Sequence, residues 1–269
     1  MKISFCYPEG RTKALTFSYD DGKEQDRRLV KIFNRYGLKA TFNLNYGLLG
    51  KKPRLTAEQL KGLYDGHEVA THGLTHPTIA RCPNEAVLEE ILEDRKGLER
   101  LFGQIVRGHA YPNGSYDERI KQILAMAGIF YARTVHSTGS FELPADLMEW
   151  NPTCHHNDPK LAEYGKMLVE DKKSQYLRLL YVWGHSYEFD VCDNWNVIED
   201  FCEAVSGRED IWYATNMEIA GYLHAVQMLA FSADLSLVYN PTAEDLWVAV
   251  RDWSNVLRIP AGETIRTGI

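Results

Sequence analysis

The sequence predicts an α/β fold built on a parallel sheet, arranged either as a barrel or as a doubly wound sheet. Its 269 residues include 45% hydrophobic and 25% charged residues, which is the composition of a globular chain. Short β-branched and aromatic runs alternate with longer stretches of helical period, a pattern typical of parallel strands joined by crossover helices. In either arrangement we expect the functional site at the carboxyl ends of the strands.

Seven segments are predicted as strands of this sheet because they are short, apolar and rich in β-branched or aromatic residues. In chain order they are 14–18, 40–44, 68–71, 105–111, 130–134, 177–183 and 211–214. From about residue 232 the pattern changes to short antiparallel strands separated by polar turns, at 235–238, 246–250 and 256–259. We therefore divide the chain into a parallel-sheet domain, 1–231, and a β appendage packed on it, 232–269.

The helices between the strands are marked by their periodicity and their start signals. The clearest is predicted at 84–102, with Asn84 as its N-cap. One face of this helix is apolar and consists of Val87, Leu88, Ile91, Leu92, Leu98 and Leu101. Capping boxes predict three further helix starts, at Thr56 with Gln59, at Ser115 with Glu118 and at Thr215 with Glu218.

Charge and composition exclude several classes of partner. The net charge is -7 and no basic run stands out, so nucleic acid is not an expected partner. No apolar run is long enough to span a membrane, and the first residues lack the features of a signal peptide. The 5 cysteines are scattered and form no CxxC pair, which indicates reduced thiols. We expect a cytoplasmic protein, or an extracellular one if a native leader was removed.

Two adjacent carboxylates, Asp20 and Asp21, end the first predicted strand and are followed by Gly22. Neighbouring side chains of an extended segment point in opposite directions, so one carboxylate can bind a cation while the other faces water or substrate. Asp-Asp-Gly is also an ordinary turn sequence, so this motif alone does not establish a site.

Histidines follow two other predicted strands. His72 and His76 lie four residues apart after the third strand, and with a carboxylate from a neighbouring strand end they would form a His₂Asp metal site with open positions. His185 follows the most apolar strand, 177–183. The turn from Tyr111 to Gly114 could direct backbone N–H groups into the mouth of the expected site, at the carboxyl ends of the strands. The polar and aromatic segment 135–157 is long enough to cover that mouth.

The order of these motifs resembles the polysaccharide deacetylase family, also called the NodB homology domain or carbohydrate esterase family 4. The motifs are SYDDG at 18–22, HGLTH at 72–76, a Pro-x-Gly turn at 112–114 and an apolar strand that ends in a histidine. The resemblance covers residues 13 to 223 or so. It implies a distorted (β/α) barrel of about seven parallel strands, with residues 232–269 as a short β appendage.

The resemblance also implies a role for each of these residues. Asp20 is implied as the general base and His185 as the general acid. Asp21, His72 and His76 are implied as the ligands of one divalent metal ion, with zinc as the expected metal. The oxyanion contact is implied for the backbone N–H of Asn113, next to Tyr111 in the same turn.

Two of the family's motifs are altered here. The third carries an arginine and a tyrosine at the positions of Ala110 and Asn113, and the arginine normally pairs with the base; we predict that Arg133 replaces it. The fourth, which orients the acid histidine, is degenerate at 146–150, where Trp150 either walls the pocket or is an ordinary buried aromatic. Four more side chains could reach the mouth without a ranking among them, namely His155, His156, Glu188 and Asp190.

These observations favour a metal-dependent hydrolase that removes the N-acetyl group from an N-acetylated sugar or oligosaccharide. A hydrolase of another C–N bond, in a small amide or cyclic ureide, is the alternative, and the altered third and fourth motifs favour it because they shape substrate contacts. A carbohydrate-binding module without catalysis is the third hypothesis. The joint presence of a base, an acid and a metal triad argues against it.

Overall fold

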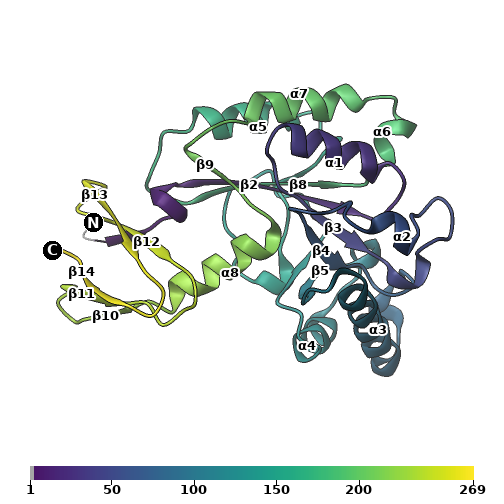
Figure 1. Ribbon diagram of the computed structural model, residues 1–269, viewed down its shortest axis with the longest axis horizontal. Coiled ribbons are helices and arrows are strands. Elements are labelled where there is room, and N and C mark those ends of the chain that lie inside the picture. The colour runs from purple at the N-terminus through teal and green to yellow at the C-terminus, as the bar shows by residue number, and fades with distance from the viewer. Residues whose placement is uncertain (1–2) are drawn as a thin grey trace.

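The structure is a computed structural model, and it describes residues 3–269. Its centre is a curled sheet in which every strand pairing is parallel, with the order β6-β5-β4-β3-β2-β8-β7 and β9 beside β2 (Figure 1). The strands are β2 Lys13–Asp20, β3 Thr41–Leu44, β4 Glu68–Thr71, β5 Gly108–Ala110, β6 Tyr131–Arg133, β7 Cys154–His155, β8 Arg178–Gly184 and β9 Ile211–Tyr213. The predicted distorted (β/α) barrel is confirmed, and all seven predicted strands are present.

Strand β2 is the centre of the sheet and is buried along its whole length. One of its edges pairs with β8 from Lys13 to Tyr19. The other edge is shared, because β9 pairs with its first three residues and β3 with its last three, Ser18 to Asp20. This arrangement fixes the end of β2 between β3 and β8, so the residues that follow it project into the middle of the carboxyl edge.

Helices cover the sheet on both sides (Figure 1). They are α1 Asp26–Arg35, α2 Ala57–Leu60, α3 Asn84–Phe102, α4 Glu118–Met126, α5 Leu161–Glu170, α6 Glu188–Val191, α7 Trp195–Val205 and α8 Asn216–Gln227. Helices α1, α5 and α7 lie together on one side, where Phe17 of β2 packs between Phe33 of α1 and Phe201 of α7, with ring centroids 4.6 and 6.0 Å away. Burial of such aromatic side chains is the main source of stability in this layer.

Most helix predictions are confirmed, and two start signals are wrong. Helix α3 has the predicted bounds, and the capping boxes at Thr56 and Thr215 are formed. Pro83 occupies the N-cap position of α3, so Asn84 instead accepts a 2.7 Å hydrogen bond from Arg119. Helix α4 is capped by Asp117 and not by Ser115, because the Asp117 carboxylate lies directly before the helix and accepts from its third N–H. Leu88, predicted on the apolar face of α3, is exposed.

Two antiparallel sheets form the appendage. Strand β12 (Leu246–Val250) pairs with β13 (Asn255–Ile259) and also with β1 (Ile3–Phe5), while β11 (Leu237–Tyr239) pairs with β10 (Ala230–Phe231) and β14 (Thr264–Arg266). Both termini therefore lie at this end of the molecule (Figure 1). Strand β1 joins the appendage although the sequence assigns residues 3–5 to the barrel. The prediction missed it because three residues carry too little periodicity to be recognised.

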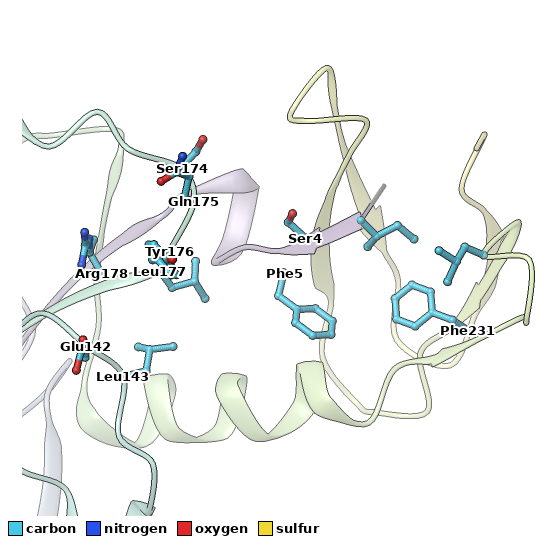
Figure 2. A pocket seen from close by; sticks show the side chains of 12 residues that line it. Ser4, Phe5, Glu142, Leu143, Ser174, Gln175, Tyr176, Leu177, Arg178 and Phe231 are labelled. Atoms are coloured by element: carbon cyan, nitrogen blue, oxygen red, sulfur yellow. The ribbon is translucent and has the colours of Figure 1, made fainter. Parts of the chain in front are cut away.

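A cavity of about 1080 Å³ lies between the appendage and the barrel. Phe5 of β1 and Phe231 of β10 face it from the appendage, and Leu143 and Leu177 face it from the barrel (Figure 2). Leu177 directly precedes β8, so the cavity lies toward the amino ends of the strands, away from the predicted site. Among the helices of residues 3–269, none has the length and apolar composition that crossing a membrane requires.

Candidate active site

Asp20, the last residue of β2, is buried at the centre of the carboxyl edge with only 2% of its surface exposed. Arg133 at the end of β6 donates from Nη2 to its Oδ1 and Oδ2 at 2.7 and 2.5 Å, and Asn43 of β3 donates to Oδ1 at 2.8 Å. Burial works against the ionised form, but the charge of Arg133, helped by His72 and His185, outweighs it and lowers the pKa of Asp20 to about 2. The carboxylate therefore stays ionised at neutral pH.

Asp21 forms ion pairs with two cations. Its Oδ1 accepts from Nη2 of Arg54 at 3.0 Å, and its Oδ2 lies 3.1 Å from Nζ of Lys23. The two cations are held there by their backbones, because Lys23 and Arg54 form an isolated antiparallel bridge between the segments that follow β2 and β3. Burial raises the pKa of Asp21, but the charges of His72, Lys23 and Arg54 lower it by more, so this carboxylate too is ionised.

His72 and His76 come from the loop after β4 and face each other, with 3.1 Å between their Nε2 atoms. The Nδ1 atom of His72 lies 2.8 Å from the carbonyl oxygen of Ala110 in β5, so the tautomer that donates there leaves a lone pair on Nε2. Burial lowers the pKa of His72 to about 4, so the ring is neutral at pH 7. Nε2 of His72 is also 3.7 Å from Oδ2 of Asp20.

Three of the predicted site residues have a left-handed backbone that is unfavourable for side chains other than glycine. Their φ angles are 83° at Asp21, 61° at His76 and 57° at Asn113. Such conformations cost about 1–3 kcal/mol each and tend to occur at functional sites, where the surrounding structure imposes them. Their concentration at one edge of the sheet supports a functional role for this edge.

His185 follows β8 and completes the group around Asp20, with its Nε2 atom 3.9 Å from Oδ2 of that carboxylate. Its Nδ1 atom lies 3.2 Å from Oε1 of Glu188. Burial opposes the charged imidazolium, but the hydrogen bond with Glu188 and the charge of Asp20 act in the other direction and raise the pKa of His185. Five predicted residues, Asp20, Asp21, His72, His76 and His185, are therefore brought together at the ends of β2, β4 and β8.

The remaining predicted residues surround this group less directly. Asn113 lies in the 3-10 turn Pro112–Gly114. This turn lies close to the loop that carries His72 and His76, because a Cβ at Gly73 would be only 3.2 Å from Pro112. Tyr111 is buried, and its hydroxyl donates to the carbonyl of Met148, so its side chain packs behind the turn. Trp150 is also buried, against Tyr131 and Tyr181 inside the barrel. The partners of both rings thus lie outside the group around Asp20.

The structure ranks the four side chains that the sequence left unranked. His155 and His156, at the end of β7, have their Nε2 atoms 3.1 and 3.2 Å from Oε2 of Glu188. Asp190 points elsewhere and accepts 2.7 Å hydrogen bonds from Trp195 and Gln25. Segment 135–157 does approach the site, but its end is the two-residue strand β7, which is too short for its pattern to be recognised.

Sequence reasoning missed three supporting side chains. Besides Asn43, which binds Asp20, Asn45 donates to the carbonyls of His72 and Gly73 at 2.6 and 2.8 Å. Asp94 of α3 is fully buried and accepts from the backbone N–H of His72 at 3.0 Å and of Tyr46 at 2.6 Å. The signal for Asp94 was present, because it lies on the apolar face of α3, where a carboxylate must have specific partners.

The residues after β2 and β4 fit a divalent metal ion. Asp21, His72 and His76 each offer one ligand atom, and these atoms lie within 4.8 Å of one another. One carboxylate and two imidazoles, one of them held neutral by burial and oriented by a carbonyl, are the donor set of a catalytic site that keeps positions open for water and substrate. An ionised carboxylate beside such a triad, with an imidazole opposite, defines a candidate hydrolytic centre.

Comparison with known proteins finds a family model that matches part of the chain. Residues 7–132, a little under half of the chain, match the family model described as Polysaccharide deacetylase. These residues include Asp20, Asp21, His72 and His76. The resemblance that the motifs indicated is thereby confirmed, since residues 7–132 match the polysaccharide deacetylase family.

Two curated relatives agree with this assignment. The chain is 25% identical over 121 residues to the "Chitooligosaccharide deacetylase" of Bradyrhizobium sp. (strain ANU 289), covering 44% of this chain and 54% of the relative. It is 30% identical over 129 residues to the "Chitin deacetylase" of Amylomyces rouxii, covering 47% of this chain and 29% of the relative. The chain thus spans about half or less of the length of these two proteins.

A solved structure confirms the fold. The crystal structure of a putative polysaccharide deacetylase from Mycobacterium smegmatis superposes with a TM-score of 0.61. The superposition covers 82% of this chain and 93% of that one, at 17% sequence identity. At that identity the similarity establishes the shared barrel and no further property.

Proposed function

We propose that this protein is a metal-dependent deacetylase that hydrolyses the N-acetyl group of an N-acetylated sugar or oligosaccharide. The family assignment supports the reaction class. The observation that carries the proposal for this chain is the position of Oδ2 of Asp20, which faces Nε2 of His72 at 3.7 Å and Nε2 of His185 at 3.9 Å. A base, a metal ligand and an acid thus surround one space at the end of β2.

Asp21, His72 and His76 would hold the metal ion. When bound, it would supply a Lewis acid that favours ionisation of water and polarises the acetamide carbonyl. Lys23 and Arg54 lie against Asp21 and keep its carboxylate ionised and oriented. Asn45 and Asp94 fix the backbone that carries His72, so two of the three ligand side chains have defined supports.

Asp20 and His185 would move the protons. Asp20 takes a proton from the attacking water at Oδ2, and Arg133 and Asn43 hold its carboxylate in place while it does so. His185 donates a proton from Nε2 to the departing nitrogen, since an amide nitrogen is a poor leaving group until it is protonated. The backbone N–H of Asn113 is assigned to the developing oxyanion, where preorganised donors are most effective.

The test is acetate release from a panel of N-acetylated substrates that includes chitooligosaccharides, peptidoglycan fragments and small non-carbohydrate amides. We expect release from at least one N-acetylated sugar, with loss of activity on chelation, recovery on adding divalent metal, and loss of at least 100-fold in Asp20→Asn. Asp190→Asn is the matched control, because its carboxylate contacts Trp195 and Gln25 outside the site. A folded, metal-loaded protein that hydrolyses only the small amides would contradict the proposed substrate class.

A further inference from the structure

Glu188 lies within 3.2 Å of a ring nitrogen of each of three histidines, His155, His156 and His185. It begins the short helix α6, three residues after His185, and its carboxylate folds back over that histidine. Oε1 lies 3.2 Å from Nδ1 of His185, and Oε2 accepts from the backbone N–H of the same residue at 3.3 Å. Both oxygens therefore contact the residue assigned as the acid.

The opposite side of this carboxylate is held by β7. Nε2 of His155 and Nε2 of His156 lie 3.1 and 3.2 Å from Oε2 of Glu188. The contacts of these histidines lower the pKa of Glu188 far below its usual range, although burial acts against them. The ends of two neighbouring parallel strands, β7 and β8, thus converge on one carboxylate whose pKa is lowered.

His156 is held in this arrangement by its shape as well as by its contact with Glu188. It is fully buried between the rings of Tyr19 and Phe189, with centroids 5.6 and 4.1 Å away. It also fills the space beside Gly184, where a Cβ would lie 2.0 Å from its Nδ1 atom. The glycine that precedes His185 is therefore required by the histidine that contacts Glu188, so the two strand ends fit together only in this arrangement.

We propose that Glu188 is the positioning residue for the acid: it holds the proton on Nδ1 of His185 and so directs Nε2 toward Asp20 and the leaving nitrogen. This inference rests on the proposed function for the role of His185. It replaces, with a carboxylate from a different part of the chain, the orienting group that the degenerate segment 146–150 lacks. In the imidazolium both nitrogens carry protons, so donation from Nε2 leaves a neutral ring whose Nδ1–H still donates to Glu188.

Several titratable groups besides Glu188 face His185. They are Asp20 on β2, His155 on β7, and Tyr187 beside it, whose ring centroid is 5.3 Å away. Asp21 acts from farther off, and Asp20 and Asp21 remain in place when Glu188 is changed. A glutamine at 188 keeps one oxygen that accepts from Nδ1, removes the charge and replaces the second oxygen by an NH₂ donor, so it tests the charge while Glu188→Ala tests the orienting contact.

The experiment is a ¹⁵N NMR titration of the histidine rings in the metal-free protein, for the wild type, Glu188→Gln, Glu188→Ala and the control Asp190→Asn. We expect the midpoint of His185 to fall by about one pH unit in Glu188→Gln with the Nδ1–H tautomer retained. In Glu188→Ala the tautomer preference should also be lost, and Asp190→Asn should match the wild type. If His185 titrates identically in the wild type and in folded Glu188→Gln, the proposal is overturned.

Two further readouts separate this inference from the proposed function. In an active enzyme, the alkaline limb of kcat/KM should move to lower pH in Glu188→Gln by the same amount as the NMR midpoint. Failure of the wild type to release acetate would contradict the proposed function while leaving the titration result unaffected. Because His155, His185 and Glu188 also have ligand atoms within 4.8 Å of one another, bound metal is counted as well. A second equivalent that Glu188→Gln abolishes would overturn the positioning role in favour of a metal site.

Discussion

The guanidinium of Arg133 in β6 contacts both carboxylate oxygens of Asp20 in β2, at 2.7 and 2.5 Å, although three strands of the sheet lie between β6 and β2. Both side chains are buried, and the planar guanidinium also lies 4.5 Å from the ring centroid of Trp183. A charge pair removed from water in this way is costly to break, because either partner alone would be left buried and uncompensated. The contact fixes the proposed base and keeps it ionised.

Replacing Arg133 should therefore shift the acid limb of the pH profile. Asp20 has its pKa lowered to about 2 in the folded protein, so loss of the neighbouring positive charge raises that pKa and protonates the base at higher pH. We expect the acid limb of kcat/KM to move upward in Arg133→Ala and by less in Arg133→Lys. Melting curves show which variants are folded. An unchanged acid limb in a folded variant would contradict the role assigned to Arg133.

Metal affinity should respond in opposite directions to two substitutions near Asp21. Removing a ligand in His76→Ala should weaken binding at least tenfold. Lys23→Met should strengthen it roughly tenfold, because Arg54 still holds the Asp21 carboxylate while one positive charge that repels the ion is removed; two unit charges 4 Å apart repel by about 1 kcal/mol even in water, and the ion carries two. Lys39→Met is the control, since Lys39 pairs with Glu218 at the opposite end of the strands. Calorimetry with zinc measures all four proteins, and weaker binding in Lys23→Met would count against this site.

Alanine substitutions at two helix glycines should change the free energy of unfolding in opposite directions. A Cβ at Gly97 in α3 would lie 2.2 Å from the ring of Tyr46, whose backbone N–H is bound by Asp94, so overpacking should destabilise Gly97→Ala by about 1–3 kcal/mol. A Cβ at Gly221 in α8 meets nothing within 4 Å, and Gly221→Ala should stabilise by about 0.5–1 kcal/mol through backbone entropy. Urea unfolding measures both, and equal effects would show that the packing of α3 on Tyr46 is not as described.

Folding stability should depend on pH through Asp26. Burial raises the pKa of this carboxyl to about 7, although Ser186 and Tyr64 donate hydrogen bonds to it. The folded state therefore keeps a proton on Asp26 that the unfolded state releases near pH 4. The contribution of Asp26 to folding stability is fully present below about pH 4 and is lost as the pH rises toward 7. The slope is at most about 1.4 kcal/mol per pH unit. In Asp26→Asn this decline should be absent, and an unchanged difference between pH 5 and pH 7 would contradict the assignment.

The strands of the parallel sheet and the central group of the site could be predicted from the sequence because both depend on strong local signals. Residues that follow apolar strands, such as Asp20 and His185, can be placed at the carboxyl edge of the sheet, because the carboxyl ends of parallel strands lie at the same edge. Arg133 could be predicted because the buried carboxylate requires a cation and the end of the next strand supplies one.

The supports of the site could not be predicted because they depend on contacts between distant segments. Glu188 meets His155 only because β7 pairs with β8, and β7 has two residues. The side chain of Tyr111 packs against Tyr116 behind the turn, with centroids 4.8 Å apart, and no pattern in the sequence distinguishes that direction from the mouth. Strand β1 joins the appendage through tertiary pairing that three residues cannot signal.

The central claim is tested most directly by counting products while metal is returned to the metal-free protein. The measurement is the yield of acetate and of free amine from an N-acetylated oligosaccharide at increasing metal-to-protein ratios, with Asp20→Asn in parallel. We predict equal yields of acetate and amine, a rate that saturates at one metal equivalent per chain, and little product in the variant. Absence of acetate at every ratio, or release that persists in Asp20→Asn, would contradict this account.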